Sequence, residues 1–356
     1  MRHLYMQASE ETRSVRKLIV LLLAVMITLA ITDGLIGLLL SHITDEPPLI
    51  LRVENVRGLQ ALWSFSDAGV KPIVFTGSSQ TYTGISPHLF DQHLQAVSGQ
   101  EIKSTNVSIV GAVAVIQRDL IRNLIIPNHP QTIIYGIEMR ALVPDSQDEN
   151  AIWSKDFRNK PLGYAVTQPS AFERNLSIWL LEHSSLVSYR DNIQQWLSGT
   201  RLINQVTYAT SASDDLGYAP FPNKFSQDGT FIKTQFIPFT VTDTTRQILM
   251  GIGETCKQNG TQCILLNMPL HELAYQYISP AEELLYRNLL KEANLPIWDF
   301  DTQACHAILG DKDFYNLNHL NSRGAELFSQ MVADAYANVY FNVPISGNAT
   351  CMTMTN

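Results

Sequence analysis

Short apolar runs alternate with helix-like segments along most of the chain beyond residue 70. The runs have the length of strands, whereas the segments between them repeat apolar residues three and four positions apart, as a helix with one buried face does. This alternation is typical of a mainly parallel sheet covered by helices on both faces. The expected strands are 73–76, 106–110, 132–136, 263–267 and 296–300, and the expected helices are 51–65, 86–97, 113–123, 280–293 and 322–337.

The alternation breaks between Arg140 and Gln262. This stretch contains a helix-like segment, 170–196, and a turn-rich aromatic loop, 208–236. Long loops inside compact domains are usually lids or binding loops. We therefore expect 141–262 to be a cap-like insertion over a site, with a structural elaboration that touches no substrate as the alternative.

A longer apolar run, 18–40, precedes the alternating region. At about 1.5 Å per residue, a helix of this length spans the roughly 30 Å hydrocarbon core of a bilayer. A cleaved signal peptide would have an apolar core of only about 7–15 residues, followed by small residues at the cleavage site. Residues 41–48, Ser-His-Ile-Thr-Asp-Glu-Pro-Pro, lack that cleavage pattern. The sequence therefore predicts an uncleaved transmembrane helix.

The charges beside this helix predict its orientation. Arg16 and Lys17 come just before it, and Asp45 and Glu46 come just after it. Because basic flanks stay in the cytoplasm, we expect a single-pass protein with a cytoplasmic tail, 1–17, and an extracytoplasmic body. The body then divides into a stalk (41–50), a folded domain (51–345) and a C-terminal tail (346–356).

Composition narrows the class of protein further. The chain has 356 residues, 45% of them apolar, which suits one large α/β domain with an insertion. Its net charge is −8, and no basic stripe stands out beyond the N-terminal flank, so nucleic acid is not an expected partner.

The four cysteines all lie on the side expected to be exported. An even number of cysteines in an oxidising compartment favours disulfides. Nearness in the sequence favours Cys256–Cys263, which leaves Cys305–Cys351 as a clamp on the C-terminal tail, although other pairings stay open. No Cys-x-x-Cys motif is present, so a zinc site is not expected.

Two segments carry candidate chemistry. Ser79 follows Gly77 at the end of an expected strand, where a helix could begin, and His319 lies near the end of the domain, before the helix 322–337. A strand-to-helix turn exposes a hydroxyl and points backbone N–H groups at the same place, which suits acyl transfer. A histidine distant in sequence can be the base for that hydroxyl. In the alternative interpretation, Ser79 only caps a helix, and His319 only caps its helix or packs in the C-terminal core.

These residues resemble the SGNH (GDSL-type) hydrolase superfamily, in particular its membrane-anchored cell-envelope branch, which includes the D-alanyl-lipoteichoic acid transfer protein and the alginate O-acetylation proteins. The resemblance covers about residues 71–340. Its four blocks are Gly77-Ser78-Ser79 in place of Gly-Asp-Ser, Gly111, Gly136-Ile137-Glu138 in place of Gly-x-Asn, and Asn316-Leu317-Asn318-His319 in place of Asp-x-x-His.

The resemblance implies a three-layer αβα sandwich with a flavodoxin-like sheet. It implies that Ser79 is the nucleophile and His319 the base, and that the N–H groups of Ser79 and Gly111 and the side chain at position 138 form the oxyanion hole. It implies no metal or organic cofactor. The partners it implies are an acylated cell-envelope glycan or glycolipid and a membrane-embedded acyl donor protein.

Two positions depart from the family pattern. Asn316 replaces the aspartate that holds the histidine, so either Asp313 takes over that role or Asn316 orients His319 through its carbonyl oxygen. Glu138 replaces an asparagine, and an ionised carboxylate there would repel the oxyanion; the alternative to a catalytic role is a structural ion pair with Arg140. The leading hypothesis is an esterase or acyltransferase, and the alternative is a catalytically degenerate binding or assembly protein.

A further histidine, His271, also lies near the end of an expected strand. His271 follows the strand 263–267, after Pro269. We expect it to be a surface residue at a strand end rather than a second base.

Overall fold

The computed structural model describes residues 2–43, 55–142, 213–236, 238–345 and 347–355, together with 176, 179, 180, 183–189 and 193. The chain divides into two compact units. One comprises Met1–Leu49 and Trp179–Leu202, and the other comprises Ile50–Ile178 and Ile203–Asn356.

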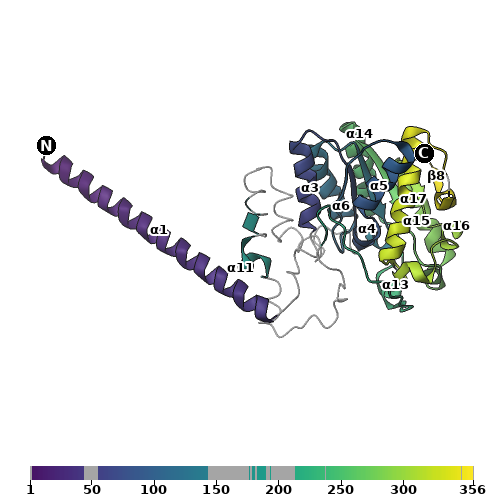
Figure 1. Cartoon of the computed structure of the whole chain (residues 1–356), viewed down its shortest axis with the longest axis horizontal. Coiled ribbons are helices and arrows are strands. Elements are labelled where there is room, and N and C mark those ends of the chain that lie inside the picture. Colours follow the sequence, from purple (N-terminus) through teal and green to yellow (C-terminus); the bar gives the residue numbers. More distant parts are fainter. Residues whose placement is uncertain are drawn as a thin grey trace. The chain divides into compact units, whose positions relative to one another are not determined.

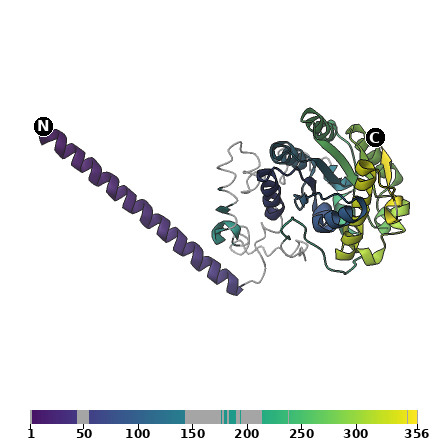
Figure 2. The same ribbon diagram turned by 45° about the horizontal axis from the view of Figure 1, so that its top comes forward.

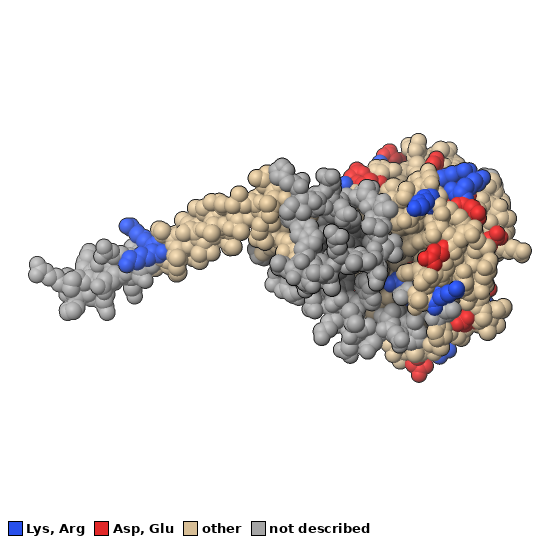
Figure 3. All heavy atoms as spheres, turned by 90° about the horizontal axis from the view of Figure 1, so that it is seen from below, with Lys and Arg blue, Asp and Glu red and all other residues tan. Residues whose placement is uncertain are grey.

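The first unit contains the long helix α1 (Arg2–Ile43). Its segment Val15–Leu39 is long and apolar enough to cross a membrane, and its side chains are not buried within the protein. Figure 3 shows basic side chains at one end of the described part of this helix and no charged side chain along the rest of it on the face in view. This agrees with the predicted apolar helix, whereas its orientation in a membrane stays a prediction.

Asp33, the acidic residue within this apolar segment, forms hydrogen bonds with the other part of the same unit, Trp179–Leu202. Its carboxylate accepts hydrogen bonds from Ser184 Oγ at 3.0 Å and from the N–H groups of Ser185 and Leu186 at 3.2 and 2.8 Å. These bonds lie at the start of the short helix α11 (Ser185–Ser188). The carboxylate therefore satisfies backbone donors that would otherwise lack a partner at a helix end.

The second unit is built on a sheet whose described strands run in the order β2-β1-β3-β4-β5-β8. The first five strands are parallel, and β8 pairs with β5 in the antiparallel direction. The order 2-1-3-4-5 is the doubly wound, flavodoxin-like arrangement, so the predicted fold class is confirmed. The strands are β1 (Ile73–Gly77), β2 (Ser104–Asn106), β3 (Thr132–Ile137), β4 (Gln262–Asn267), β5 (Ile297–Asp299) and β8 (Thr353–Thr355).

Helices cover both faces of this sheet, as Figures 1 and 2 show. One apolar cluster joins the sheet to the helices of one face, and a second cluster joins it to those of the other face. In the central strand β3 every residue is buried, as the alternating side chains enter both clusters. The helices of the first face are α3 (Val56–Asp67), α6 (Ala114–Leu120), α14 (Asp243–Gln258) and α15 (Pro280–Glu292), and those of the second face are α5 (Pro87–Ser98) and α17 (Ser322–Phe341).

One predicted strand was misplaced. The strand expected at 106–110 ends at Asn106, where it was expected to begin. The Asn106 side chain explains this, because its Nδ2 donates to the carbonyls of Thr81 and Ile85 and its Oδ1 accepts from the Ser108 N–H. Such local side-chain bonds turn the chain after Asn106, although the N–H groups of Val107 and Ile109 still donate to the Phe75 and Gly77 carbonyls of β1.

About half of the expected cap, including 143–175 and 194–212, lies outside the described residues. The later part of 141–262 contains α13 (Thr230–Gln235) and α14. Helix α14 buries Ile248, Leu249 and Ile252 in the cluster that covers the sheet, so this part of the segment belongs to a helical layer. The cap itself stays a prediction.

The disulfides follow the expected pairing. Cys256–Cys263 joins the end of α14 to β4, with 6.1 Å between the Cα atoms. Cys305–Cys351 joins α16 (Gln303–His306) to the residues just before β8, with 4.9 Å between the Cα atoms. The second bridge therefore holds the C-terminal segment against the edge of the sheet.

Candidate active site

The candidate site lies where β1 and β3 end. These strands are neighbours in the sheet, and Gly77 pairs with Gly136. Ser79 lies two residues beyond Gly77 and Glu138 two residues beyond Gly136, so the register brings both to the same level of the sheet's carboxyl edge. Ligands bind at this edge in open parallel sheets.

A tight turn presents Ser79. Helix α4 (Ser79–Gly84) starts immediately after β1, and the hydroxyl of Ser78 caps it by accepting from the Gln80 N–H at 3.3 Å. A Cβ atom at Gly77 would collide with Thr81 Oγ1 and with the Gly136 carbonyl, so only glycine fits there.

Ser79 and His319 meet across 240 residues of sequence. His319 Nε2 lies 2.8 Å from Ser79 Oγ, and the two residues are only 7% and 8% exposed. His319 comes from β7 (His319–Leu320), which forms a two-stranded antiparallel ribbon with β6 (Phe314–Asn316). The distance is that of a hydrogen bond, so the imidazole is within reach of the hydroxyl proton.

Asn316 holds the other side of the imidazole. Its Oδ1 lies 3.1 Å from His319 Nδ1 and also accepts from the N–H groups of Asn318 and His319 at 3.1 and 2.9 Å. Two backbone donors at this atom require it to be the amide oxygen rather than the nitrogen. Nδ1 therefore carries the proton, and Nε2 is left free to accept from Ser79.

Asp313 is not the residue that orients His319. Its carboxylate accepts from the Gly310 N–H at 3.2 Å and lies 3.3 Å from Arg323 Nε. Among the described residues, the hydrogen-bonding group next to His319 Nδ1 is Asn316, so the structure favours the second of the two expected arrangements.

The imidazole is a neutral base. Burial lowers the pKa of His319 to about 3, and the positive charge of Arg140 acts in the same direction. Because the folded-state pKa lies below the ordinary value of about 6.5, the ring stays unprotonated through the whole neutral range. It can therefore accept a proton from Ser79 without first losing one.

Gly111 lies in the turn beside Ser79. The Ile109 N–H donates to the Gly77 carbonyl at 3.0 Å, which holds this turn against the end of β1. Gly111 has φ = 76°, a conformation that glycine adopts without strain. The turn that contains Gly111 is therefore held at the end of β1, two residues before Ser79. The N–H groups of Gly111 and Ser79 are the two expected backbone donors to the oxyanion.

Glu138 and Arg140 are both buried near this turn, with 4% and 9% exposure. Glu138 Oε1 accepts a short hydrogen bond from Ser78 Oγ, and Arg140 Nη1 lies 3.9 Å from the same oxygen. Burial raises the pKa of Glu138, while Arg140, Ser78 and Gln80 oppose that rise. The ion pair considered from the sequence is therefore present only as a long contact.

Sequence reasoning missed two supporting side chains. Gln117 accepts from Thr76 Oγ1 at 2.6 Å and donates to the Gly77 carbonyl at 2.7 Å, which braces the end of β1 from helix α6. Phe221 packs its ring edge-on against His319, with 5.2 Å between centroids. Gln117 is a polar residue inside an apolar helical run, which is a usable signal, whereas Phe221 is one aromatic residue among several in its loop.

The expected surface position of His271 was wrong. It is buried, its Nε2 lies 2.9 Å from Asp311 Oδ1, and its Nδ1 accepts from the Leu273 N–H at 3.2 Å. Its ring also packs against Phe225 and Phe314. Both ring nitrogens are therefore used in local structure.

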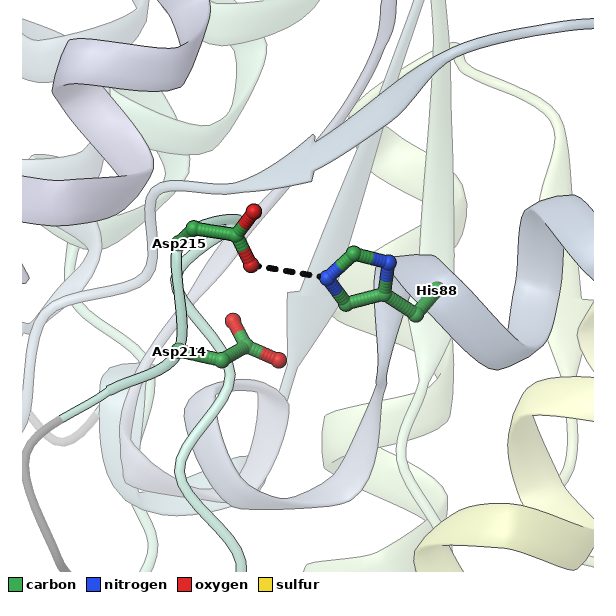
Figure 4. Close-up of side chains that lie close together, drawn as sticks. All are labelled: His88, Asp214 and Asp215. Atoms are coloured by element: carbon green, nitrogen blue, oxygen red, sulfur yellow. Dashed lines mark hydrogen bonds and ion pairs between the residues drawn. The ribbon is translucent and has the colours of Figure 1, made fainter.

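Another histidine, His88, lies close to two aspartates, and these three side chains are of the kinds that bind metal ions. The ligand atoms of His88, Asp214 and Asp215 all lie within 4.8 Å of one another, and Figure 4 shows them facing one another. His88 and Asp215 form an exposed pair at 2.8 Å, while Asp214 Oδ1 accepts from the Leu216 and Tyr218 N–H groups. These contacts account for the arrangement without a ligand.

Searches for similar proteins leave the chain without a family assignment. No family model matches it, and no curated protein matches it. Among solved structures it is similar to two mutants of Axe2, an acetyl-xylooligosaccharide esterase from Geobacillus Stearmophilus. Each is 12% identical and covers 75% of this chain and 93% of its own, with TM-scores of 0.36 and 0.35. Because the identities and TM-scores are this low, the argument for function rests on the geometry of the site and not on these similarities.

Proposed function

We propose that this chain is a membrane-anchored, extracytoplasmic serine esterase or O-acyltransferase of the SGNH type. The observation that carries the proposal is the 2.8 Å distance between Ser79 Oγ and His319 Nε2, with Asn316 on the other ring nitrogen. A nucleophile, a base and an orienting group in that order are the arrangement that serine acyl transfer requires.

The mechanism uses these groups in two halves. His319 Nε2 takes the proton of Ser79 as its oxygen attacks the carbonyl carbon of an ester or thioester, and the N–H groups of Ser79 and Gly111 donate to the oxyanion. The protonated imidazole then gives its proton to the leaving group, which leaves an acyl-enzyme. Water or a sugar hydroxyl, deprotonated by His319, attacks the acyl group and releases Ser79.

The substrate class we propose is an acylated cell-envelope glycan or glycolipid, with a membrane-embedded acyl donor protein as a partner. Support comes from the apolar segment Val15–Leu39, because an anchored enzyme meets substrates at the membrane surface, and from the family resemblance of the sequence.

Turnover of p-nitrophenyl acetate by the full chain in detergent micelles tests the esterase proposal. The wild-type chain should hydrolyse the ester, and Ser79→Ala should reduce turnover to the background rate. Ser108→Ala is the matched control, since Ser108 is also buried and its hydroxyl has no hydrogen-bond partner among the described residues. Equal turnover by the wild type and Ser79→Ala would contradict the proposal.

A degenerate binding or assembly protein is the competing function, favoured by the loss of negative charge at Asn316. It predicts that Ser79→Ala leaves the cellular phenotype intact while changes in the insertion abolish it. A phenotype lost through Ser79→Ala alone would eliminate this alternative.

A further inference from the structure

We propose that Glu138 is a neutral carboxylic acid whose Oε2–H donates a hydrogen bond to the oxyanion formed at Ser79. This inference rests on the proposed acyl-transfer function. It turns a residue that would repel the oxyanion in its ionised form into a third donor for the transition state.

The position of Glu138 follows from the sheet register. Gly77 and Gly136 are paired on neighbouring strands, and Ser79 and Glu138 each lie two residues further along. Neighbouring strands are about 4.8 Å apart. The side chain is connected to the same turn, because the Ser78 hydroxyl donates to Glu138 Oε1.

The hydrogen bonds assign different roles to the two carboxyl oxygens. Ser78 Oγ donates its proton to Glu138 Oε1, which is therefore an acceptor. Glu138 Oε2 is buried and makes no hydrogen bond among the described residues, and neither does the neighbouring Gln80 side chain. A buried, ionised oxygen without a donor is costly, whereas a protonated Oε2 is a donor that awaits an acceptor.

The groups around Glu138 are compatible with the neutral form. Those that face it are Arg140 on its own segment, Tyr135 of β3 and Tyr286 of α15. Burial raises the pKa of both tyrosines, so neither contributes a charge. Arg140, the Ser78 hydroxyl and the Gln80 side chain favour ionisation of Glu138, but burial outweighs them in raising its pKa, and the nearest Arg140 contact is 3.9 Å.

Carboxylic acids kept neutral by burial can donate to an oxyanion in this way. The sign of the pH effect follows directly. Below its raised pKa, Glu138 keeps the proton and donates; above that pKa, it ionises, loses the donor and places a negative charge beside the oxyanion. The reaction should therefore slow at alkaline pH.

The test compares Glu138→Gln, Glu138→Ala and the wild-type full chain, with p-nitrophenyl acetate turnover measured across pH and the Ser79→Ala rate subtracted. We expect the wild type to lose activity at alkaline pH. Glu138→Gln should match it within a few-fold at neutral pH but keep its activity at alkaline pH, because an amide N–H does not ionise there. Glu138→Ala should be about 10²–10³-fold slower.

Asp91→Asn is the control, because Asp91 is a half-buried carboxyl with a raised pKa of about 6 that contacts Ser104 outside this site. It should leave the alkaline part of the profile unchanged. A tenfold or larger increase of the neutral-pH rate in Glu138→Gln would overturn the inference, because it would show that an ionised Glu138 had been slowing the reaction.

An infrared measurement separates this inference from the proposed function. The carbonyl stretch of a protonated carboxylic acid should be present at neutral pH in the wild type and absent in Glu138→Gln. Ser79-dependent turnover without that band overturns the neutral-acid inference alone. Absence of Ser79-dependent turnover in the wild type overturns the proposed function and this inference with it.

Discussion

At the residue scale, the neutral group on His319 Nδ1 is the feature that most affects the expected rate. An aspartate in this position both fixes the tautomer and stabilises the imidazolium that forms during the reaction. Asn316 fixes the tautomer, because its oxygen is held by two backbone N–H groups, but it carries no charge. The site should therefore be correctly oriented and slow.

Asn316→Asp should accelerate the reaction. The carboxylate can accept the same three hydrogen bonds and adds a negative charge that stabilises the imidazolium and raises the pKa of His319. We expect kcat/KM for p-nitrophenyl acetate to rise by about tenfold or more. Asn316→Ala, which removes the acceptor, should reduce it; an unchanged rate in both variants would show that this position does not act through His319.

The acid side of the pH profile tests the state of the base. Because the pKa of His319 is lowered to about 3, the imidazole stays neutral as the pH falls through the ordinary histidine range. Wild-type kcat/KM should therefore remain flat from neutral pH to about pH 5. An acid limb centred near the unperturbed value of about 6.5 would contradict a buried, neutral His319.

At the element scale, the site depends on pairing that no short stretch of sequence encodes. The runs 73–76 and 132–136 could be predicted as strands because each is an apolar block between polar residues. The pairing of Gly77 with Gly136 could not be predicted from the sequence, because it arises from contacts across the sheet. The same holds for the hydrogen bonds to Asn316, because the β6–β7 ribbon has no apolar alternation to mark it.

Strand β8 was missed for a related reason. The strand has only three residues, Thr353–Thr355, and all are exposed, so it shows no hydrophobic pattern. They pair with β5 just after Cys351, which lies two residues earlier and is bonded to Cys305. The cysteine spacing predicted this bridge only as a clamp on the C-terminal tail.

The two disulfides should differ in their effect on stability. The loop closed by Cys305–Cys351 has a sequence separation of 46, whereas that closed by Cys256–Cys263 has a separation of 7. Chain entropy then predicts losses of about 4 and about 2 kcal/mol on removal. Thermal unfolding of the paired Cys→Ser variants should show the lower Tm for Cys305→Ser with Cys351→Ser; the reverse order would contradict this account.

At the scale of the whole molecule, the chain joins an apolar helix to an α/β domain with a buried serine–histidine pair. The surface of the domain mixes acidic and basic side chains on the face that Figure 3 shows. The expectation that nucleic acid is not a partner rests on the net charge of −8 and stays a prediction.

The apolar segment predicts how the chain fractionates. Expressed in cells, the full chain should stay with the membranes through an alkaline carbonate wash, because Val15–Leu39 would have to leave the hydrocarbon to be extracted. A chain lacking residues 2–43 should be released. Extraction of the full chain by carbonate would contradict transmembrane anchoring.

The central claim is that His319 activates Ser79 as a nucleophile, and covalent labelling measures this most directly. The full chain is treated with a fluorophosphonate probe and mapped by peptide mass spectrometry. We predict one adduct on the peptide that contains Ser79, absent in Ser79→Ala and strongly reduced in His319→Ala. A chain that remains unlabelled, or an adduct on Ser79 that forms equally fast in His319→Ala, would contradict the claim.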